Sequence, residues 1–272
     1  MVTIRLASDR PQILAAGSIG AAWLAVARRI LAEGIASRYD GLAVREISLV
    51  TLAVDQADPA DEIIARHAEP ERLAWMHANF TDYTQVAALG GADSYARRLF
   101  DYEHSGRDQV AWVIDRLRQD PASRSATITT FQPHTDSSYI PCVSLLDFWL
   151  PDGAVELVTY AHSIDFGAKG YGNLVELAAL QQHVARALGR PAGRLLMVVK
   201  SAHIYETERG YVLGVLAAED GRPTGGEAGK PRTDGGADAD GYSRAGSWPR
   251  SASLASLRAS VRDLPRACGG SR

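Results

Sequence analysis

Residues 141–165 read PCVSLLDFWLPDGAVELVTYAHSID and contain two apolar, partly β-branched runs joined by a turn signal. Runs of this length and composition predict strands over 143–150 and 154–160. Pro151-Asp152-Gly153 lies between them and is typical of a hairpin turn, because glycine readily adopts a positive φ. The stretch therefore predicts an antiparallel pair of strands, with Cys142 directly before the first.

Further runs on both sides of this hairpin indicate that strands and helices alternate along the chain. The predicted strands lie at 43–54, 126–131 and 195–200, and the predicted helices at 18–33, 61–78 with a break near Pro70, 107–119 and 173–188. This order predicts an α+β fold, a mixed α/β sandwich in which helices flank a large mixed sheet. A doubly wound nucleotide-binding fold is excluded, since no glycine-rich phosphate loop follows a first strand.

Charge and hydropathy exclude several classes of partner. The formal net charge of the 272 residues is −3 at pH 7 and no basic run occurs, so we expect no binding to a nucleic acid polymer. No apolar segment approaches the roughly 20 residues that a membrane-spanning helix needs, and the N-terminus lacks a signal pattern. We expect a cytoplasmic protein with no membrane contact.

The two cysteines of the sequence lie in different contexts. Cys142 and Cys268 form neither a disulfide framework nor a metal-ligand spacing, so we expect a reduced Cys142 and no metal site.

From residue 219 onward the chain is rich in Gly, Asp, Ser and Arg. This composition predicts a flexible tail over 219–272 that follows one catalytic domain over 1–218.

Several reactive or ligand-binding side chains follow one another after Cys142. A cysteine thiolate suits addition to an electron-poor ring, because it attacks and later leaves readily. Asn173 offers both a donor and an acceptor to the edge of a pyrimidine. His203 and Tyr205 alternate on a predicted strand end and therefore face the same side. With Asp165 they indicate an enzyme site for a nucleotide-like ring.

Each of these residues also has a purely structural interpretation. Cys142 is compatible with a small buried residue at the start of a strand. Asn173 is compatible with a cap on the helix that follows it. His203 and Tyr205 are compatible with a core pair that satisfies its own hydrogen bonds.

The order and spacing of Pro141-Cys142, His162-Ser163-Ile164-Asp165, Asn173 and His203-Ile204-Tyr205 resemble motifs of the thymidylate synthases and the related pyrimidine-nucleotide hydroxymethylases. The resemblance covers residues 40–216 and is strongest from 108 onward. It implies a role for each matching residue: Cys142 is the nucleophile, His162 and Ser163 contact the phosphate, Asp165 orients the pterin of the folate, Asn173 reads the base, and His203 and Tyr205 hold the sugar.

The residues expected to bind the nucleotide phosphate differ from the family pattern. His162 stands where the family has an arginine, and an imidazole is a weaker, pH-dependent cation. Arg124 alone remains where two adjacent arginines cross from the partner subunit. Arg38 corresponds to the arginine of the family's mobile loop. A different nucleotide, or even a nucleoside, therefore stays open as the substrate.

The general base and the residue that shields the reactive intermediate are harder to align. Glu71 is our choice for the base and Glu46 is the alternative; either is also compatible with a solvated surface glutamate. Tyr83 takes the place of a shielding tryptophan near the cofactor.

The resemblance implies a homodimeric transferase that uses 5,10-methylenetetrahydrofolate as co-substrate to methylate or hydroxymethylate C5 of a pyrimidine nucleotide through a covalent bond between Cys142 and C6. Asn173 favours uracil, because an aspartate would suit the cytosine amino group more directly. Two alternatives remain: a CMP or dCMP 5-hydroxymethylase of nucleoside natural-product biosynthesis, and a non-catalytic nucleotide-binding relative.

Overall fold

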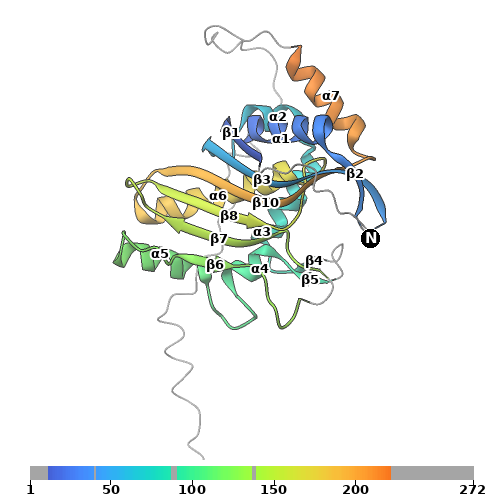
Figure 1. Cartoon of the computed structure of the whole chain (residues 1–272). Coiled ribbons are helices and arrows are strands. Elements are labelled where there is room, and N and C mark those ends of the chain that lie inside the picture. Colours follow the sequence, from blue (N-terminus) through green and yellow to red (C-terminus); the bar gives the residue numbers. More distant parts are fainter. Residues whose placement is uncertain (1–11, 40, 87–90, 137–138, 222–272) are drawn as a thin grey trace, which may run out of the picture.

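The computed structural model describes residues 12–39, 41–86, 91–136 and 139–221 (Figure 1). The elements follow in the order β1 (Gln12–Ser18), α1 (Ile19–Glu33), β2 (Ile35–Tyr39), β3 (Leu42–Gln56), α2 (Glu62–His67), α3 (Pro70–Thr81), β4 (Gln85–Val86), β5 (Ala92–Asp93), α4 (Tyr95–Phe100), α5 (Gln109–Gln119), β6 (Thr127–Thr129), β7 (Val143–Trp149), β8 (Val155–Ala161), β9 (Ile164–Asp165), α6 (Gly170–Leu188), β10 (Ala192–Tyr205) and α7 (Arg209–Asp220). The predicted α+β class is confirmed.

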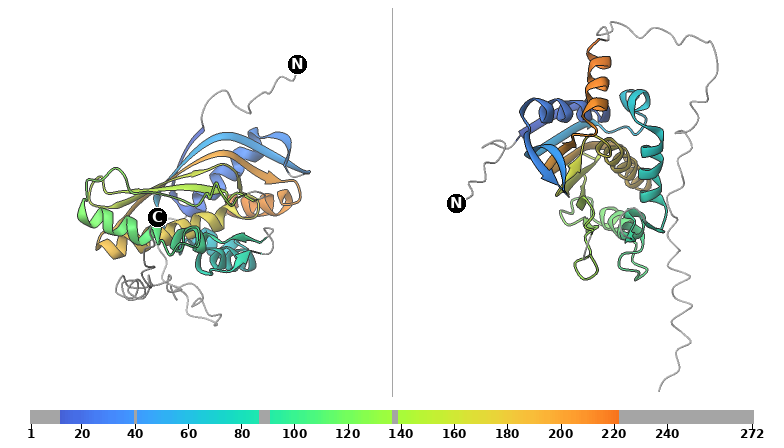
Figure 2. Two further views of the ribbon diagram at one scale, coloured as in Figure 1. Left: turned by 90° about the horizontal axis from the view of Figure 1, so that it is seen from below. Right: turned by 90° about the vertical axis from the view of Figure 1, so that its right-hand side faces the viewer.

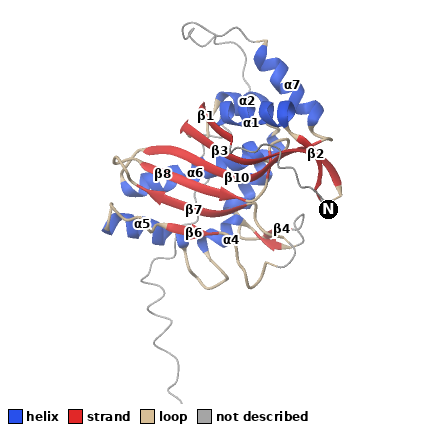
Figure 3. Cartoon of the chain, viewed as in Figure 1, coloured by secondary structure: helices blue, strands red, loops and turns tan. Residues whose placement is uncertain are grey.

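One large mixed sheet forms the centre of the fold (Figure 3). Its strand order is β1-β3-β10-β8-β7-β6, with β2 added to β3 and β9 added to β10. The β1–β3 and β8–β10 pairs are parallel, whereas β3–β10 and β7–β8 are antiparallel. The predicted hairpin is the β7–β8 pair, and Gly153 in its turn has a φ of 83°.

Helices α1, α5 and α6 pack on one face of the sheet (Figure 2). Helix α6 lies innermost, with apolar residues such as Leu174, Leu177 and Leu180 fully buried. Exposed apolar side chains mark the opposite face, where Leu145 and Tyr160 are cross-strand partners that are 37% and 38% exposed. No helix of the described ranges covers that opposite face.

Local signals explain where the helices begin and end. Asp61 accepts hydrogen bonds from the backbone N–H groups of residues 63 and 64 and so begins α2, and Pro70 begins α3. Asp108 caps α5. Gly189, with a φ of 64°, ends α6 in the left-handed conformation that glycine tolerates.

Several bounds differ from the sequence prediction. Helix α6 begins at Gly170 rather than at 173, and β10 is longer than the predicted 195–200 because it pairs with β3 along almost its whole length. The predicted strand over 126–131 forms only Thr127–Thr129. Helix α7 extends through Asp220, and the rest of the predicted tail from 222 onward lies outside the described residues. No helix in the described part of the chain is long and apolar enough to cross a membrane.

Candidate active site

Four strand ends bring the predicted site residues together. Cys142 directly precedes β7, and its carbonyl oxygen accepts a hydrogen bond from the backbone N–H of His162, 3.0 Å away, which follows β8. Asp165 at the end of β9 lies opposite His203 in the parallel β9–β10 pair. Segments that are up to 61 residues apart in sequence, 142 and 203, thus meet at one edge of the sheet.

Cys142 is a partly buried free thiol. Burial raises the pKa of the thiol, whereas the positive charge of Lys169 and a hydrogen bond with the Tyr139 hydroxyl act to lower it. The negative charge of Asp165 acts in the direction of burial. The next backbone N–H, that of Val143, donates to the buried Tyr95 hydroxyl at 2.9 Å, which fixes the chain directly after the thiol. The thiol is therefore held in place and sensitive to charges around it.

His203 is a neutral imidazole with one unused nitrogen. Burial lowers its pKa to about 4, and the charge of Lys169 acts in the same direction. Its Nδ1 lies 3.4 Å from the Ser163 hydroxyl, and its buried Nε2 has no hydrogen-bond partner in the described ranges. The Tyr205 ring meets it edge-on at 5.1 Å between centroids, so the predicted pair is in contact. The free Nε2 is suited to a ligand hydroxyl.

Asn173 lies in the first turn of α6, where its Nδ2 donates to the carbonyl oxygen of Lys169 at 3.1 Å. Because a carbonyl only accepts, this bond fixes the orientation of the amide. Its Oδ1 is buried without a bonding partner among the described residues. The helix-cap interpretation is wrong, since Lys169 occupies the N-cap. Asn173 therefore presents a free acceptor.

Asp165 is a carboxylate whose pKa burial raises to about 6. Its Oδ1 accepts from the backbone N–H groups of Gly167 at 2.9 Å and Ala168 at 3.3 Å. A carboxylate held in this way keeps its second oxygen for the N–H groups of a ring.

The residues predicted to contact the phosphate offer little positive charge. Burial lowers the pKa of His162, and the charge of Lys200 acts in the same direction. The Nδ1 of His162 lies 3.4 Å from the Ser144 hydroxyl. Arg38 is exposed and donates to the carbonyl oxygen of Gly41 at 2.8 Å, while the neighbouring Tyr39 ring lies 5.5 Å from that of His203. Arg38 thus lies at the rim of the site.

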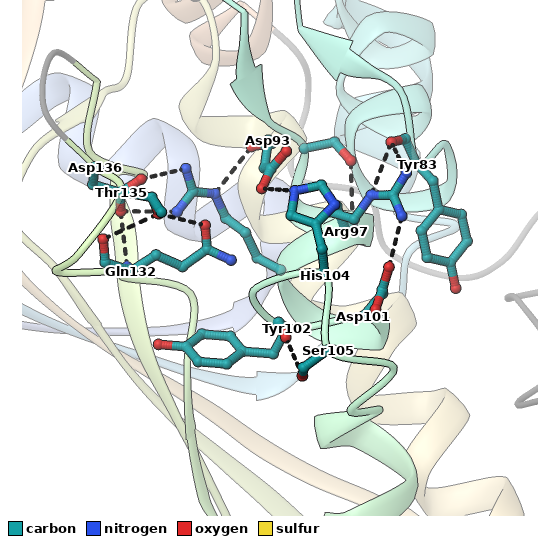
Figure 4. Close-up of polar contacts among 12 residues, drawn as sticks. Tyr83, Asp93, Arg97, Asp101, Tyr102, His104, Ser105, Gln132, Thr135 and Asp136 are labelled. Carbon is teal, nitrogen blue, oxygen red and sulfur yellow. Dashed lines mark hydrogen bonds and ion pairs between the residues drawn. The ribbon is translucent and has the colours of Figure 1, made fainter. Parts of the chain in front are cut away.

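The remaining predicted residues come from other elements of the fold. Arg124 is exposed between α5 and β6, and Glu71 is exposed in the first turn of α3. Neither side chain makes a hydrogen bond or ion pair with other described residues. Glu46, the alternative base, is half-buried and opposite His203 in the β3–β10 ladder. Tyr83 lies beside Arg97, whose guanidinium is 5.1 Å from its ring centroid, and on the far side of the polar group from Asp136 (Figure 4).

Helix α4 holds the loop that leads to Cys142, a feature that the sequence did not reveal. The buried Arg98 makes a bidentate ion pair with Asp136 at 2.7 and 2.8 Å and also donates to the carbonyl oxygens of Asp93 and Thr130. Asp136 in turn accepts from the backbone N–H of Gln132 (Figure 4). An arginine in a short, polar helical stretch gives no sequence signal for such burial.

Comparison with known proteins agrees with this geometry. The profile of the thymidylate synthase family matches residues 66–221. A candidate thymidylate synthase of Methanosarcina barkeri is 30% identical over 213 residues, which cover 75% of this chain and 94% of that protein. A second, from Methanosarcina acetivorans, is 32% identical over 154 residues, which cover 54% of this chain and 70% of that protein. The thymidylate synthase of varicella-zoster virus is 31% identical over 107 residues, which cover 39% of this chain and 36% of that protein. The chain therefore belongs to the thymidylate synthase family, whose members are enzymes of the C5-methyltransferase type.

Proposed function

We propose that this protein transfers a one-carbon unit from methylenetetrahydrofolate to C5 of a uracil nucleotide through a covalent bond between Cys142 and C6. One observation carries the proposal. Asn173 Oδ1 and His203 Nε2 are buried polar atoms without partners in the described chain, and both belong to segments that meet at Asp165, near Cys142. Buried polar atoms are normally hydrogen-bonded, so this pair indicates a polar ligand beside the thiol.

Cys142 supplies the step that makes C5 reactive. Its thiolate adds to C6, a carbon–sulfur bond forms, and the ring electrons move towards C5 and O4, which makes C5 a nucleophile. Bound methylenetetrahydrofolate supplies the one-carbon unit and, for a methyl product, a hydride. A base removes the C5 proton as the bond between the one-carbon unit and the folate nitrogen breaks. Addition of the hydride then gives a methyl group and dihydrofolate, or addition of water gives a hydroxymethyl group and tetrahydrofolate, and the carbon–sulfur bond breaks to return the thiolate.

The other residues orient the nucleotide. Asn173 Oδ1 accepts the N3–H of uracil, and His203 and Tyr205 bind the sugar. His162 and Ser163 contact the phosphate at the exit of β8. The half-buried carboxylate of Asp165 accepts N–H groups of the pterin, which fits a folate.

Three assignments rest on the resemblance alone. The roles of Glu71 as general base and of Tyr83 as shield of the intermediate come from the family pattern. Arg124 contacts the phosphate only if it crosses from a second subunit. The exposed apolar face around Leu145 and Tyr160 supports such a homodimer.

A cytidylate 5-hydroxymethylase is the second candidate, because Asn173 Oδ1 equally accepts a hydrogen bond from the amino group of cytosine. The pyrimidine that the enzyme accepts and the group that it adds to C5 distinguish the two candidate functions.

Tritium release tests the proposal. The protein is incubated with UMP, dUMP, CMP or dCMP labelled at C5, with and without methylenetetrahydrofolate, and the products are separated by chromatography. We expect folate-dependent release of tritium from a uracil nucleotide. Release from cytosine nucleotides alone would favour the hydroxymethylase, and no release from any of the four would indicate a protein that only binds nucleotides.

A further inference from the structure

The turn that follows Asp165, between β9 and α6, is held by several elements of the fold. The backbone N–H of Phe166 donates to the carbonyl oxygen of His203 on β10 at 2.8 Å. The carbonyl oxygen of Phe166 accepts a buried hydrogen bond from Trp23 Nε1 on α1, also at 2.8 Å. These two bonds fix the start of the turn, just before the N–H groups that bind the Asp165 carboxylate.

Gly167, the next residue of this turn, lies directly against the N-terminus of α7. A Cβ added to Gly167 would lie only 2.8 Å from the Cβ of Glu208 and 3.2 Å from Asp165 Oδ1. Because carbon atoms pack at about 3.5–4.0 Å, a side chain at Gly167 would push the turn away from α7. Glycine therefore allows a close approach here, and one point in space borders both the Asp165 carboxylate and Glu208.

The carboxylate of Glu208 contacts α3 and does not cap its own helix. Glu208 occupies the N-cap of α7 without a side-chain capping bond. Its Oε2 accepts a hydrogen bond from Arg72 Nη2 at 3.0 Å, in an ion pair whose arginine and glutamate side chains are 29% and 23% exposed. Arg72 also pairs with Glu69, and its guanidinium lies 5.9 Å from the ring centroid of Tyr211. Arg72 thus joins α3 to the residue of α7 that packs against Gly167.

The same ion pair compensates a charge that is unfavourable beside Asp165. Burial raises the pKa of the Asp165 carboxyl, and the negative charge of Glu208 acts in the same direction. Like charges disfavour ionisation of their neighbours, whereas a cation paired with one of them reduces the repulsion. Arg72 therefore allows Glu208 to lie close to the turn without an uncompensated negative charge next to the Asp165 carboxylate.

We propose that Glu208, held by Arg72, is a positioning residue for Asp165: it supports the turn whose N–H groups orient the carboxylate that accepts from the pterin. Glu208 acts through its contact with Gly167 and not by direct contact with a ligand. The consequence for folate binding rests on the proposed function, whereas the support of the turn does not.

Hydrogen exchange of the Gly167 and Ala168 backbone N–H groups, followed by NMR without any ligand, tests the support of the turn. Both groups donate to Asp165 Oδ1, so their exchange rates report how often the turn opens. We expect Arg72→Met to accelerate this exchange about threefold to fivefold, the effect of losing a partly exposed ion pair. Arg72→Lys should restore much of the protection, because it keeps the charge.

Arg66→Met is the matched control. Arg66 pairs with Glu219, near the other end of α7, at 3.2 Å and with side-chain exposures of 30% and 14%, so its replacement removes a similar link to the same helix. Exchange at Gly167 should stay unchanged in this variant. An equal acceleration in Arg66→Met and Arg72→Met would indicate a general loosening of α7 and would overturn the proposal, as would unchanged exchange in folded Arg72→Met.

Glu208→Gln keeps the shape of the side chain but removes its charge, and it replaces Arg72→Met if that variant does not fold. It should accelerate exchange at Gly167 to a similar extent. The double variant should exchange no faster than either single variant, because the two side chains act as one pair. Additive effects of the two changes would mean that Arg72 acts on the turn by another route and would contradict the proposal.

Steady-state kinetics test the consequence for the folate. In the tritium-release assay, Arg72→Met should raise the KM for methylenetetrahydrofolate by a similar factor and leave kcat and the KM for the nucleotide unchanged, because Asp165 acts on the folate. Accelerated exchange with an unchanged folate KM would overturn the link to Asp165. Accelerated exchange in a protein that releases no tritium would leave the support by Glu208 intact and refute the proposed function instead.

Discussion

At the scale of single residues, the site consists of polar groups that the protein alone does not fully satisfy. Asn173 and His203 each keep a buried polar atom without a partner in the described structure, and burial raises the pKa of the Asp165 carboxyl to about 6. Such groups cost folding free energy unless a ligand pairs them. A stability measurement can therefore detect the site without any substrate.

Replacing Asp165 by asparagine should stabilise the protein above pH 6. The folded carboxyl has a pKa of about 6, raised from 3.8 by burial, so the ionised form is disfavoured in the folded state. Below pH 4 both states are protonated and no penalty exists; above pH 6 the full penalty applies, at most about 3 kcal/mol. Urea denaturation should show a stability advantage of Asp165→Asn that grows between pH 4 and 6. An advantage independent of pH would contradict the raised pKa.

The sequence predicted most members of the site because their order along the chain carries the chemistry. In the structure Cys142, Asp165 and His203 lie at or near strand ends and Asn173 lies in the first turn of α6, and their roles in the site stay predictions. The contact of Lys169 with Trp75 was not predictable, because an isolated lysine in a loop gives no signal until the fold places it beside an aromatic ring.

At the scale of elements, α4 determines where the loop before Cys142 lies. Its Arg98 and the loop residue Asp136 are almost completely buried, with side-chain exposures of 2% and 4%. Removing one partner of a buried ion pair leaves the other charge uncompensated. The loop therefore depends on this pair more than on any surface contact of the same helix.

Asp136→Ala should cost about 3–5 kcal/mol of unfolding free energy. Asp101→Ala on the same side of the molecule is the control, because it removes the partner of Arg97 in a pair that is 27% and 22% exposed. That change should cost about 1 kcal/mol. Chemical denaturation of both variants measures the difference, and equal losses would show that the Arg98 pair does not hold the loop.

Two helical glycines should respond oppositely to alanine. A Cβ at Gly20 in α1 would clash with Asp61 and Ile63, whereas a Cβ at the exposed Gly214 in α7 would meet nothing within 4 Å. We expect Gly20→Ala to destabilise by about 1–3 kcal/mol and Gly214→Ala to stabilise by about 1 kcal/mol. Thermal unfolding distinguishes them, and a neutral Gly20→Ala would mean that α1 and α2 are not in close contact.

The strands with strong β-branched runs, β3, β7 and β8, were predicted to within two residues. The missed elements lack such a signal. Strand β1 has the sequence QILAAGS, in which apolar and polar residues do not alternate. It depends on parallel pairing with β3, whose partner residues lie about 38 positions later in the sequence. Helix α4 has six residues, and its buried Arg98 contradicts the usual pattern of polar residues outside.

At the scale of the whole molecule, the uncovered face of the sheet is where we propose that a second subunit binds. Leu145 and Tyr160 lie side by side on it, and Val198 pairs with Tyr160 in the adjacent ladder. An apolar sheet face of this kind is normally covered in a soluble assembly. If this face forms the proposed homodimer interface, the charged substitution Tyr160→Asp should convert dimers to monomers in analytical ultracentrifugation. A dimer that persists would place the interface elsewhere.

Shared active sites follow if Arg124 acts in the neighbouring subunit. Mixing inactive Cys142→Ser with inactive Arg124→Ala should restore up to about a quarter of the activity, because half of the dimers are hybrids and one of their two sites is intact. No recovery, despite subunit exchange demonstrated by mass spectrometry, would contradict the shared site.

The most direct test of the account is the covalent adduct on Cys142. A uracil nucleotide with fluorine at C5 has no C5 proton to lose, so the reaction should stop with sulfur bonded to C6. With methylenetetrahydrofolate present, intact-protein mass spectrometry should show the protein heavier by one nucleotide and one folate, and peptide mapping should place the addition on Cys142. Cys142→Ser should show no addition. The same adduct in that variant, or its absence from a wild-type protein that releases tritium, would contradict the central role of Cys142.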